Sequence, residues 1–239
     1  MKKWIFLTTV ITISFFSSPA IFASYRQVKP CEASYEVSMK GISAGTVVRT
    51  LKIDKQQHYQ FTSLTESSLA FINLKIFEAS QGIWTQGGPQ PHLYQYHYRV
   101  FSKKSDIISR FNWHKMIANT IKNGKRNYAV HIPNDAQDKI SFQLALRHSL
   151  LNHAKNFVYK IVDKDDVNTY IFKKIDTETL KTPMGKIETI KMQRTNAKKD
   201  DEVFTFWLAP KYDYLLIKVT VTEDNHLVAE GKIKKLKYY

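Results

Sequence analysis

A serine between two glycines is the first place where residue types and spacing could do chemistry. Residues 41–45, Gly-Ile-Ser-Ala-Gly, match the G-x-S-x-G pattern in which a serine nucleophile lies on a sharp turn between a strand and a helix. Residues 46–51 alternate in the manner of a strand, whereas that turn requires a helix to follow. We therefore interpret the two glycines as hairpin residues and expect no catalytic residue, with a hydrolase that uses Ser43 as the less favoured alternative.

Eight histidines raise the question of a metal site. His148 and His153 fall on one predicted helix, but five residues turn their side chains about 140° apart, whereas two helical ligands need a spacing of three or four. The acidic turn at 163–168 has Val167 in place of an oxygen ligand, and it lacks the glycine of a calcium loop. We expect no bound metal and no cofactor.

Aromatic residues concentrate on two neighbouring predicted strands. Tyr94, Tyr96 and Tyr98 share one face of the first strand, and Phe111 and Trp113 share one face of the next. Rings with an apolar body and a polar tip suit a pocket for a lipid chain or a sugar ring. Aromatic cross-strand pairs also stabilise ordinary sheets, so a purely structural role is the alternative.

One arginine lies on the apolar side of a predicted helix that runs from about Asp138 to Asn152. The apolar stripe of this helix, within about 40° at 100° per residue, consists of Ile140, Leu144 and Leu151. Arg147 falls inside the stripe, so its guanidinium should point toward the sheet or its rim. A buried charge of this kind must be compensated. The guanidinium could pair with a carboxylate on a strand, extend to the solvent-exposed edge of the helix, or bind a ligand carboxylate or phosphate at the mouth of a pocket.

Alternation with period two dominates the elements that must position these residues. It predicts a first strand at Ala33–Met39 and a second at Val47–Ile53. Turn sequences such as Asn123-Gly124 separate the strands. We expect a mainly β fold in which an antiparallel meander forms a curved sheet, half-barrel or sandwich, with one α-helix packed on it. The further predicted strands are 57–64, 74–85, 93–101, 106–113, 116–122, 128–132, 157–162, 169–176, 187–194, 203–208, 215–222 and 227–236.

The helix interrupts this pattern near the middle of the chain. Residues 134–137, Asn-Asp-Ala-Gln, resemble a helix start with Asn134 as its N-cap. The helix should cover one open face or mouth of the sheet, because an amphipathic helix buries its stripe. We expect a single exported domain over residues 24–239, with any subdivision near 133–155.

The first 23 residues have the three parts of a cleaved signal peptide. Lys2 and Lys3 precede an apolar run from Trp4 to Phe16, and Ala23 is the small residue at the expected cut. The sequence therefore predicts a periplasmic protein. No later segment approaches about 18 consecutive apolar residues, so we expect no membrane-spanning helix. The single cysteine, Cys31, excludes an internal disulfide.

The chain is strongly basic, with 36 lysines and arginines against 21 acidic residues and a formal net charge of +15. Such a charge attracts polyanions. The positive residues are spread along the sequence without a nucleic-acid-binding motif, so we expect no nucleic acid partner. In an envelope compartment, lipid head groups and acidic glycans are the natural anionic partners.

The order and spacing of several short motifs give a family resemblance over most of the chain after the predicted signal peptide. They are 33–37 (Ala-Ser-Tyr-Glu-Val), 40–42 (Lys-Gly-Ile) with Gly45, 111–113 (Phe-Asn-Trp), Asp138 and Ser141 with Leu146-Arg147, 182–187 (Thr-Pro-Met-Gly-Lys-Ile) and 207–210 (Trp-Leu-Ala-Pro). The chain resembles the bacterial periplasmic domain of unknown function 3108 (DUF3108) family. The resemblance implies a periplasmic β-rich protein without an established activity, and it supplies no catalytic residues.

Together these observations favour a non-enzymatic binding or envelope-maintenance module that shelters a lipid-like or amphiphilic ligand. Its candidate ligand-binding residues are Tyr94, Tyr96, Tyr98, Phe111, Trp113 and Arg147. The alternative is a basic module that docks on an acidic glycan or a membrane surface. A serine hydrolase of the envelope is less favoured.

Overall fold

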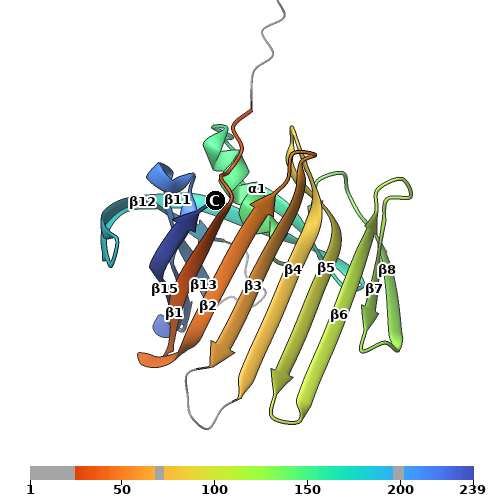
Figure 1. The fold of residues 1–239 in the computed structure, drawn as a ribbon, viewed down its shortest axis with the longest axis horizontal. Helices are drawn as coiled ribbons and strands as arrows, with labels where there is room; N and C mark the ends of the chain where they lie inside the picture. Colours follow the sequence, from red (N-terminus) through yellow and green to blue (C-terminus); the bar gives the residue numbers. More distant parts are fainter. Residues whose placement is uncertain (1–24, 68–72, 196–201) are drawn as a thin grey trace, which may run out of the picture.

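The computed structural model describes residues 25–67, 73–195 and 202–239. Within them the chain forms one open, curved sheet with a single α-helix, α1 (Ser141–Leu151), and a 3-10 turn, η1 (Pro210–Tyr212) (Figure 1). The predicted signal peptide lies outside the described residues. The strands are β1 (Cys31–Met39), β2 (Ile42–Ile53), β3 (His58–Ser67), β4 (Leu74–Thr85), β5 (Gly88–Val100), β6 (Lys103–Asn112), β7 (Ile117–Lys122), β8 (Arg126–His131), β9 (Ala136–Gln137), β10 (Val158–Asp163), β11 (Asp166–Thr182), β12 (Gly185–Arg194), β13 (Glu202–Ala209), β14 (Leu215–Glu223) and β15 (His226–Tyr238).

The sheet consists of two meanders joined by the first and last strands. Its order is β8-β7-β6-β5-β4-β3-β2-β1-β15-β14-β13-β12-β11-β10-β9, so β1 and β15 are neighbours near its centre. The prediction of a mainly β fold with one helix is confirmed. The sheet is mainly antiparallel, as expected, and one pair departs from the meander, because β9 and β10 are parallel. Helix α1 lies between these two strands in the sequence, and such a crossover allows parallel pairing.

Antiparallel pairing sends successive turns to alternate ends of the sheet. The turns at 40–41, 101–102, 123–125 and 224–225 lie at one end, called here the lower end (Figure 1). The opposite, upper end carries α1 and the C-terminus. The backbone N–H of Tyr239 donates to the carbonyl of Pro30 at 3.3 Å, so the C-terminus lies beside the entry to β1.

Helix α1 is buried on nearly all sides because it packs against both meanders. Leu144 and Leu151 belong to the core formed with β2–β7, as the predicted stripe requires. Phe142 and Leu146 belong to a second core formed with β10–β14. The stripe read from the sequence is therefore only one of two apolar faces, and the helix closes the upper part of the space between the meanders.

The helix begins three residues later than the sequence predicted, and Asn134 is not its cap. Ala136 and Gln137 form β9, whose extended backbone cannot begin a helix. The N-cap position is Ile140, and the carboxylate of Asp138, two residues earlier, does the work of a capping side chain. Its Oδ1 accepts hydrogen bonds from the backbone N–H of Ile140 at 2.9 Å and of Ser141 at 2.7 Å, and its own N–H donates to the Ser141 hydroxyl.

The capping carboxylate is also part of a buried polar chain. Its Oδ2 accepts a 2.5 Å hydrogen bond from the Ser80 hydroxyl, which lies 3.0 Å from the hydroxyl of Tyr59. Complete burial raises the pKa of Asp138 to about 6, although these hydrogen bonds oppose the shift. The folded protein therefore binds a proton at Asp138 more tightly than the unfolded chain does.

Substitution of Asp138 by Asn should remove this pH dependence, because the amide keeps an acceptor for the helix N–H groups and cannot ionise. Between pH 7.5 and pH 5 the wild type should gain about 1.4 kcal/mol of unfolding free energy relative to Asp138→Asn. The wild type gains stability on acidification. A group whose pKa is higher in the folded than in the unfolded state stabilises the folded protein as the pH falls below the folded-state pKa. Urea unfolding at both pH values measures it, and equal pH dependence of the two proteins would contradict the assignment.

Candidate functional site

The space below α1 contains a small cavity between the two meanders. Its volume is about 30 Å³, enough for about one water molecule. Tyr35 and Arg49 line it from β1 and β2, Arg147 lines it from the helix, and Leu216 lines it from β14. The cavity therefore lies where the central strands meet the helix.

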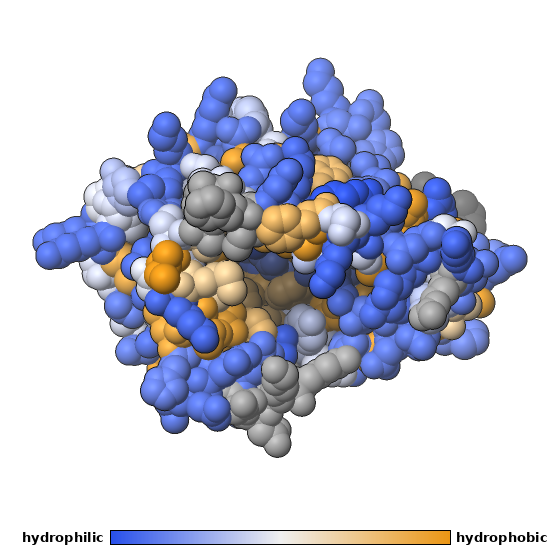
Figure 2. All heavy atoms as spheres, turned by 90° about the horizontal axis from the view of Figure 1, so that it is seen from below, coloured by the Kyte–Doolittle hydropathy of each residue, from blue (hydrophilic) through white to orange (hydrophobic). Residues whose placement is uncertain are grey.

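A larger hollow of about 170 Å³ adjoins this cavity toward the lower end. The two share Tyr35, Arg49 and Leu216. We call the two together the inner pocket. Figure 2, viewed from below, shows a hollow with hydrophobic residues on its wall and mostly hydrophilic residues around it. The remaining apolar wall of the larger hollow consists of Val37, Val47, Val219, Val221 and Ala229.

Arg147 brings an almost fully buried cation to the inner pocket. Its side chain points from α1 into the sheet, and the residue is 6% exposed. Its Nε donates to the carbonyl of Asp213 at 3.0 Å, whereas its buried Nη2 has no hydrogen-bond partner. No ion pair joins Arg147 to a carboxylate within the described part of the chain. One donor of the guanidinium thus remains available inside the protein.

The thiol of Cys31 responds to this charge. Burial raises the pKa of the thiol, while the positive charge of Arg147 and a hydrogen bond from it act in the opposite direction. The sulfur therefore stays a neutral thiol and does not neutralise Arg147.

Arg49 adds a second cation where the two parts of the inner pocket meet. Its Nη1 donates to Oε1 of Gln143 on α1 at 2.6 Å, and its buried Nε has no hydrogen-bond partner. The guanidinium carbon lies 5.6 Å from the ring centre of Tyr35. The Tyr35 hydroxyl donates to the carbonyl of Leu216 at 2.9 Å, and burial raises the pKa of this hydroxyl to about 12.

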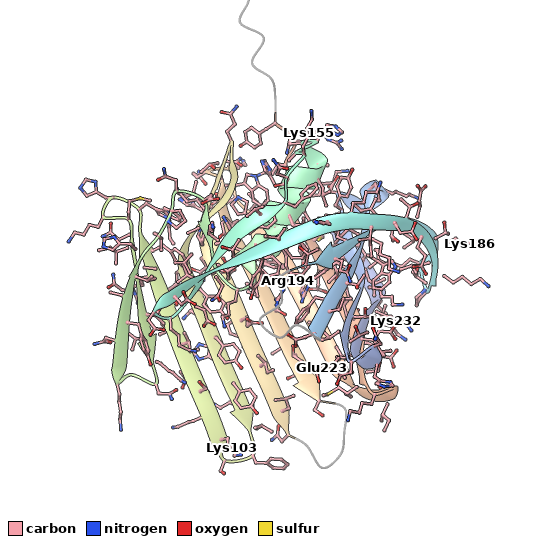
Figure 3. All side chains as sticks on the ribbon, turned by 180° about the vertical axis from the view of Figure 1, so that it is seen from behind. Lys103, Lys155, Lys186, Arg194, Glu223 and Lys232 are labelled. Atoms are coloured by element: carbon pink, nitrogen blue, oxygen red, sulfur yellow. The ribbon has the colours of Figure 1, made fainter. Side chains whose placement is uncertain are left out.

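A third arginine faces the enclosed space from β12. The guanidinium of Arg194 lies 4.5 Å from the ring centre of Tyr170 and 4.4 Å from that of Phe204. Its Nε is buried without a hydrogen-bond partner. Figure 3 shows Arg194 between the two meanders. The interior therefore presents unpaired cationic donors within a largely apolar wall.

The structure places the three tyrosines proposed from the sequence farther along the concave face of the sheet. Tyr94 is buried in the core, and its hydroxyl donates to Oε1 of Glu78 at 2.7 Å. Burial raises the pKa of Glu78. The rings of Tyr96 and Tyr98 stack with their centres 6.5 Å apart. None of the three lines the inner pocket.

Phe111 and Trp113 form a stacked pair with ring centres 5.9 Å apart. The indole N–H of Trp113 donates to the carbonyl of Pro91 at 2.9 Å. Trp113 borders a separate cleft of about 320 Å³ beside α1. The structure therefore does not bring these rings together with Arg147 in one pocket.

Sequence reasoning missed Tyr35, Arg49 and Leu216 as pocket residues. A signal for Arg49 was present, because it alternates with Val47 and Leu51 and so shares their inward face. It is a cation on the apolar side of a strand, as Arg147 is on the apolar side of the helix. No local pattern shows that Leu216 lies opposite them.

The serine of the G-x-S-x-G match lies within a strand, as expected from the hairpin interpretation. Ser43 belongs to β2 and donates to Oε1 of Glu36 at 3.3 Å. The preceding turn has Lys40 at φ 48° and Gly41 at φ 80°, so glycine suits the left-handed backbone there. The match is therefore a hairpin bend rather than a strand-to-helix turn.

Two further findings concern the described residues only. They contain no cluster of three or more His, Cys, Asp or Glu side chains arranged to hold a metal ion. Their helix is too short to cross a bilayer.

Comparison with known proteins gives the family. The model of the family described as "Protein of unknown function (DUF3108)" matches residues 34–230. The chain belongs to the DUF3108 family. The match covers β2–β14, most of β1 and the first part of β15, so the lining of the inner pocket falls within the family region except for Cys31, Ala33 and Gly231.

Solved structures show what this DUF3108 fold is similar to. A β-barrel-like protein of the domain of unknown function DUF1849 from Brucella abortus has a TM-score of 0.57 and 11% identity, covering 89% of this chain and 99% of that one. A putative lipoprotein from Parabacteroides distasonis has a TM-score of 0.35 and 11% identity, with 89% and 97% covered. A DUF1329 family protein from Desulfovibrio piger has a TM-score of 0.29 and 9% identity, with 88% and 86% covered. No curated protein matches the chain.

The hydrogen bond from Tyr94 to Glu78 predicts unequal effects of two similar substitutions. Tyr94→Phe should lower the unfolding free energy by about 1–3 kcal/mol, because it removes a partner of a carboxylate that burial already disfavours. Tyr98→Phe, on the same face of β5, is the matched control and should change it by less than about 0.5 kcal/mol. Chemical denaturation measures both, and equal effects would contradict a specific role for the Tyr94 hydroxyl.

Proposed function

We propose that this protein binds an anionic amphiphile in the inner pocket, as a non-enzymatic binding module of the bacterial envelope. The observation that carries the proposal is the unpartnered, buried Nη2 of Arg147 at the end of an apolar hollow. Export through residues 1–23, expected from the sequence, would bring the protein to a compartment rich in such molecules.

The charge of Arg147 is the first argument. A buried guanidinium without a carboxylate carries a large desolvation cost, and structural arginines usually recover it from a paired carboxylate. Here the fixed partner is the carbonyl of Asp213, a neutral acceptor. The planar guanidinium of Arg147 keeps a free N–H donor, which suits the carboxylate or phosphate of a ligand.

The shape of the inner pocket is the second argument. Arg147 lies at the helix end and Arg49 where the two parts of the pocket meet. The wall toward the lower end consists of valine, alanine and glycine together with Glu230, whose carboxylate is paired with Lys218 and Lys232. A ligand would therefore bind with its anionic group innermost and its apolar part toward the lower end. The hollow of about 170 Å³ is close to the size of a cavity of about 150 Å³ that takes up benzene, so it suits a slender chain.

The chemistry of the described residues also favours binding over catalysis. Ser43 hydrogen-bonds a carboxylate at an exposed hairpin, and no histidine is hydrogen-bonded to it. The buried Asp138 caps a helix, which gives it a structural role. These features support the binding proposal and make the hydrolase alternative less favoured.

Decanoic acid and 1-decanol differ only in the anionic group, so they test the role of Arg147. The wild type should bind the acid about 10–100 times more tightly than the alcohol, as hydrogen bonds to charged groups allow. Arg147→Met should remove this preference while leaving the affinity for the alcohol within about twofold. Isothermal titration calorimetry measures both ligands. Arg110→Met, at an exposed position on the outer face of β6, is the matched control and should bind as the wild type does.

Unfolding of the ligand-free proteins separates the binding role from a structural one. If Arg147 is kept for a ligand, Arg147→Met should leave the free energy of unfolding unchanged or raise it, since an apolar side chain replaces an uncompensated buried charge. A loss of more than about 3 kcal/mol together with an unchanged acid-to-alcohol ratio would mean that the guanidinium serves the fold, and the proposal would be wrong.

A further inference from the structure

Large apolar side chains are exposed at the hairpin tips of the lower end. Phe101 is 72% exposed at the β5–β6 turn, and Ile42 and Met39 are 67% and 59% exposed beside the β1–β2 turn. Leu227 is 42% exposed beside the β14–β15 turn, and Ile121 is 40% exposed near the end of β7. Among the described residues, nine large apolar side chains are exposed, and five of them belong to this end.

Two of these hairpins lie side by side. The backbone N–H of Lys40 in the β1–β2 turn donates to the carbonyl of Val228 on β15 at 3.1 Å. Met39, Ile42 and Leu227 are therefore close neighbours at the edge of the larger hollow, which Val37 and Ala229 line on the same strands. Single exposed apolar residues are normal, but turn tips usually carry polar residues, so this grouping needs a reason.

Exposed lysines alternate with these apolar residues. Lys40 lies in the β1–β2 turn, Lys103 and Lys104 begin β6 directly after Phe101, and Lys125 lies in the β7–β8 turn. All four are exposed, and none forms an ion pair with another described residue. Figure 3 shows Lys103 at the lower tip of the sheet, at the end opposite Lys155. We call the five apolar residues and these four lysines the lower rim.

We infer that the lower rim is a docking surface for a membrane that contains anionic phospholipids. The apolar tips would enter the boundary between head groups and acyl chains, and the lysines would contact lipid phosphates. This docking is a separate property from ligand binding, because no residue of the lower rim lines the inner pocket. It rests on the proposed function in one respect only: the inner pocket would open toward the bilayer on which the protein docks.

The chemistry of the lower rim favours a bilayer over its competitors. An acidic glycan would pair with the lysines but would leave Phe101 and Ile42 exposed to water. A second copy of the chain would bring lysines of the two rims together, which repels. The apolar residues lie on separate hairpins around a hollow rather than on one flat patch, and a fluid lipid surface can meet such separated points.

Vesicle co-sedimentation with two lipid compositions tests the inference. The wild type should partition about tenfold more strongly onto phosphatidylcholine vesicles with about 30% phosphatidylglycerol than onto phosphatidylcholine alone. This preference should disappear when NaCl is raised from about 0.05 M to about 0.5 M, because salt screens exposed charges. Equal binding to both compositions, or no binding to either, would overturn the inference.

Paired variants separate the lower rim from the rest of the surface. Ile42→Ser combined with Phe101→Ser should lower partitioning about tenfold, and Lys103→Glu combined with Lys104→Glu should do the same. The controls are Ile175→Ser, an apolar residue 47% exposed on β11, and Lys186→Glu on β12, and both should bind vesicles as the wild type does. If the two control variants lost as much vesicle binding as the rim variants do, the inference would be overturned.

Two more readouts make the result specific. Phe101→Trp should show quenching by brominated phospholipids, whereas Ile175→Trp should not, which reports insertion at the lower rim. Sedimentation velocity without lipid should give monomer-like values that the rim variants leave unchanged. A shift toward smaller species in those variants would assign the rim to a second copy instead. The rim variants should keep the decanoic acid affinity of the wild type, so failure of the docking inference and failure of the binding proposal can be told apart.

Discussion

The pairing of the first strand with the last is the constraint on which the rest of the structure depends. The ladder between β1 and β15 runs from Cys31 opposite Tyr238 to Met39 opposite Ala229, with one irregularity after Ser34. Apart from the parallel β9–β10 pair, each meander is built from local hairpins, and only the β1–β15 ladder makes them one sheet. It also brings Tyr35 of β1 against Leu216 of β14, so the inner pocket exists only once the two ends of the chain have met. Contacts of such long sequence separation form late and slowly in folding.

Local patterns in the sequence predicted the elements well where one face of each strand is apolar. The strand predicted at 74–85 has those bounds, because Ala79 and Trp84 are buried and the turn residues that follow are polar. Strand β11 continues to Thr182, six residues past its predicted end. Residues 177–182 are mostly exposed and pair only with β12, so they lack the alternation that marks a half-buried strand.

The helix and the site show what local patterns omit. The apolar stripe predicted from Leu144 and Leu151 is present. The second meander also covers Phe142 and Leu146 on another side of the helix, and a periodicity analysis that assumes one buried face does not predict this. The inward direction of Arg147 followed from the same periodicity. The positions of Tyr35 and Leu216 beside Arg147 could not be predicted in this way. They depend on the pairing of β1 with β15, which no short segment of the sequence encodes.

The β1–β15 ladder also fixes how the molecule would respond to force. The strands are antiparallel neighbours, and their outermost pair, Cys31 and Tyr238, lies at the upper end, where the chain enters β1 and leaves β15. Tension applied through these ends of β1 and β15 would break the hydrogen bonds of the ladder one after another, in an unzipping geometry. It would not load them all at once, as a shear geometry does. The mechanical weak line of the sheet therefore runs between the two meanders and past the wall of the inner pocket, so that pulling on the termini would open the pocket before it unfolds either meander.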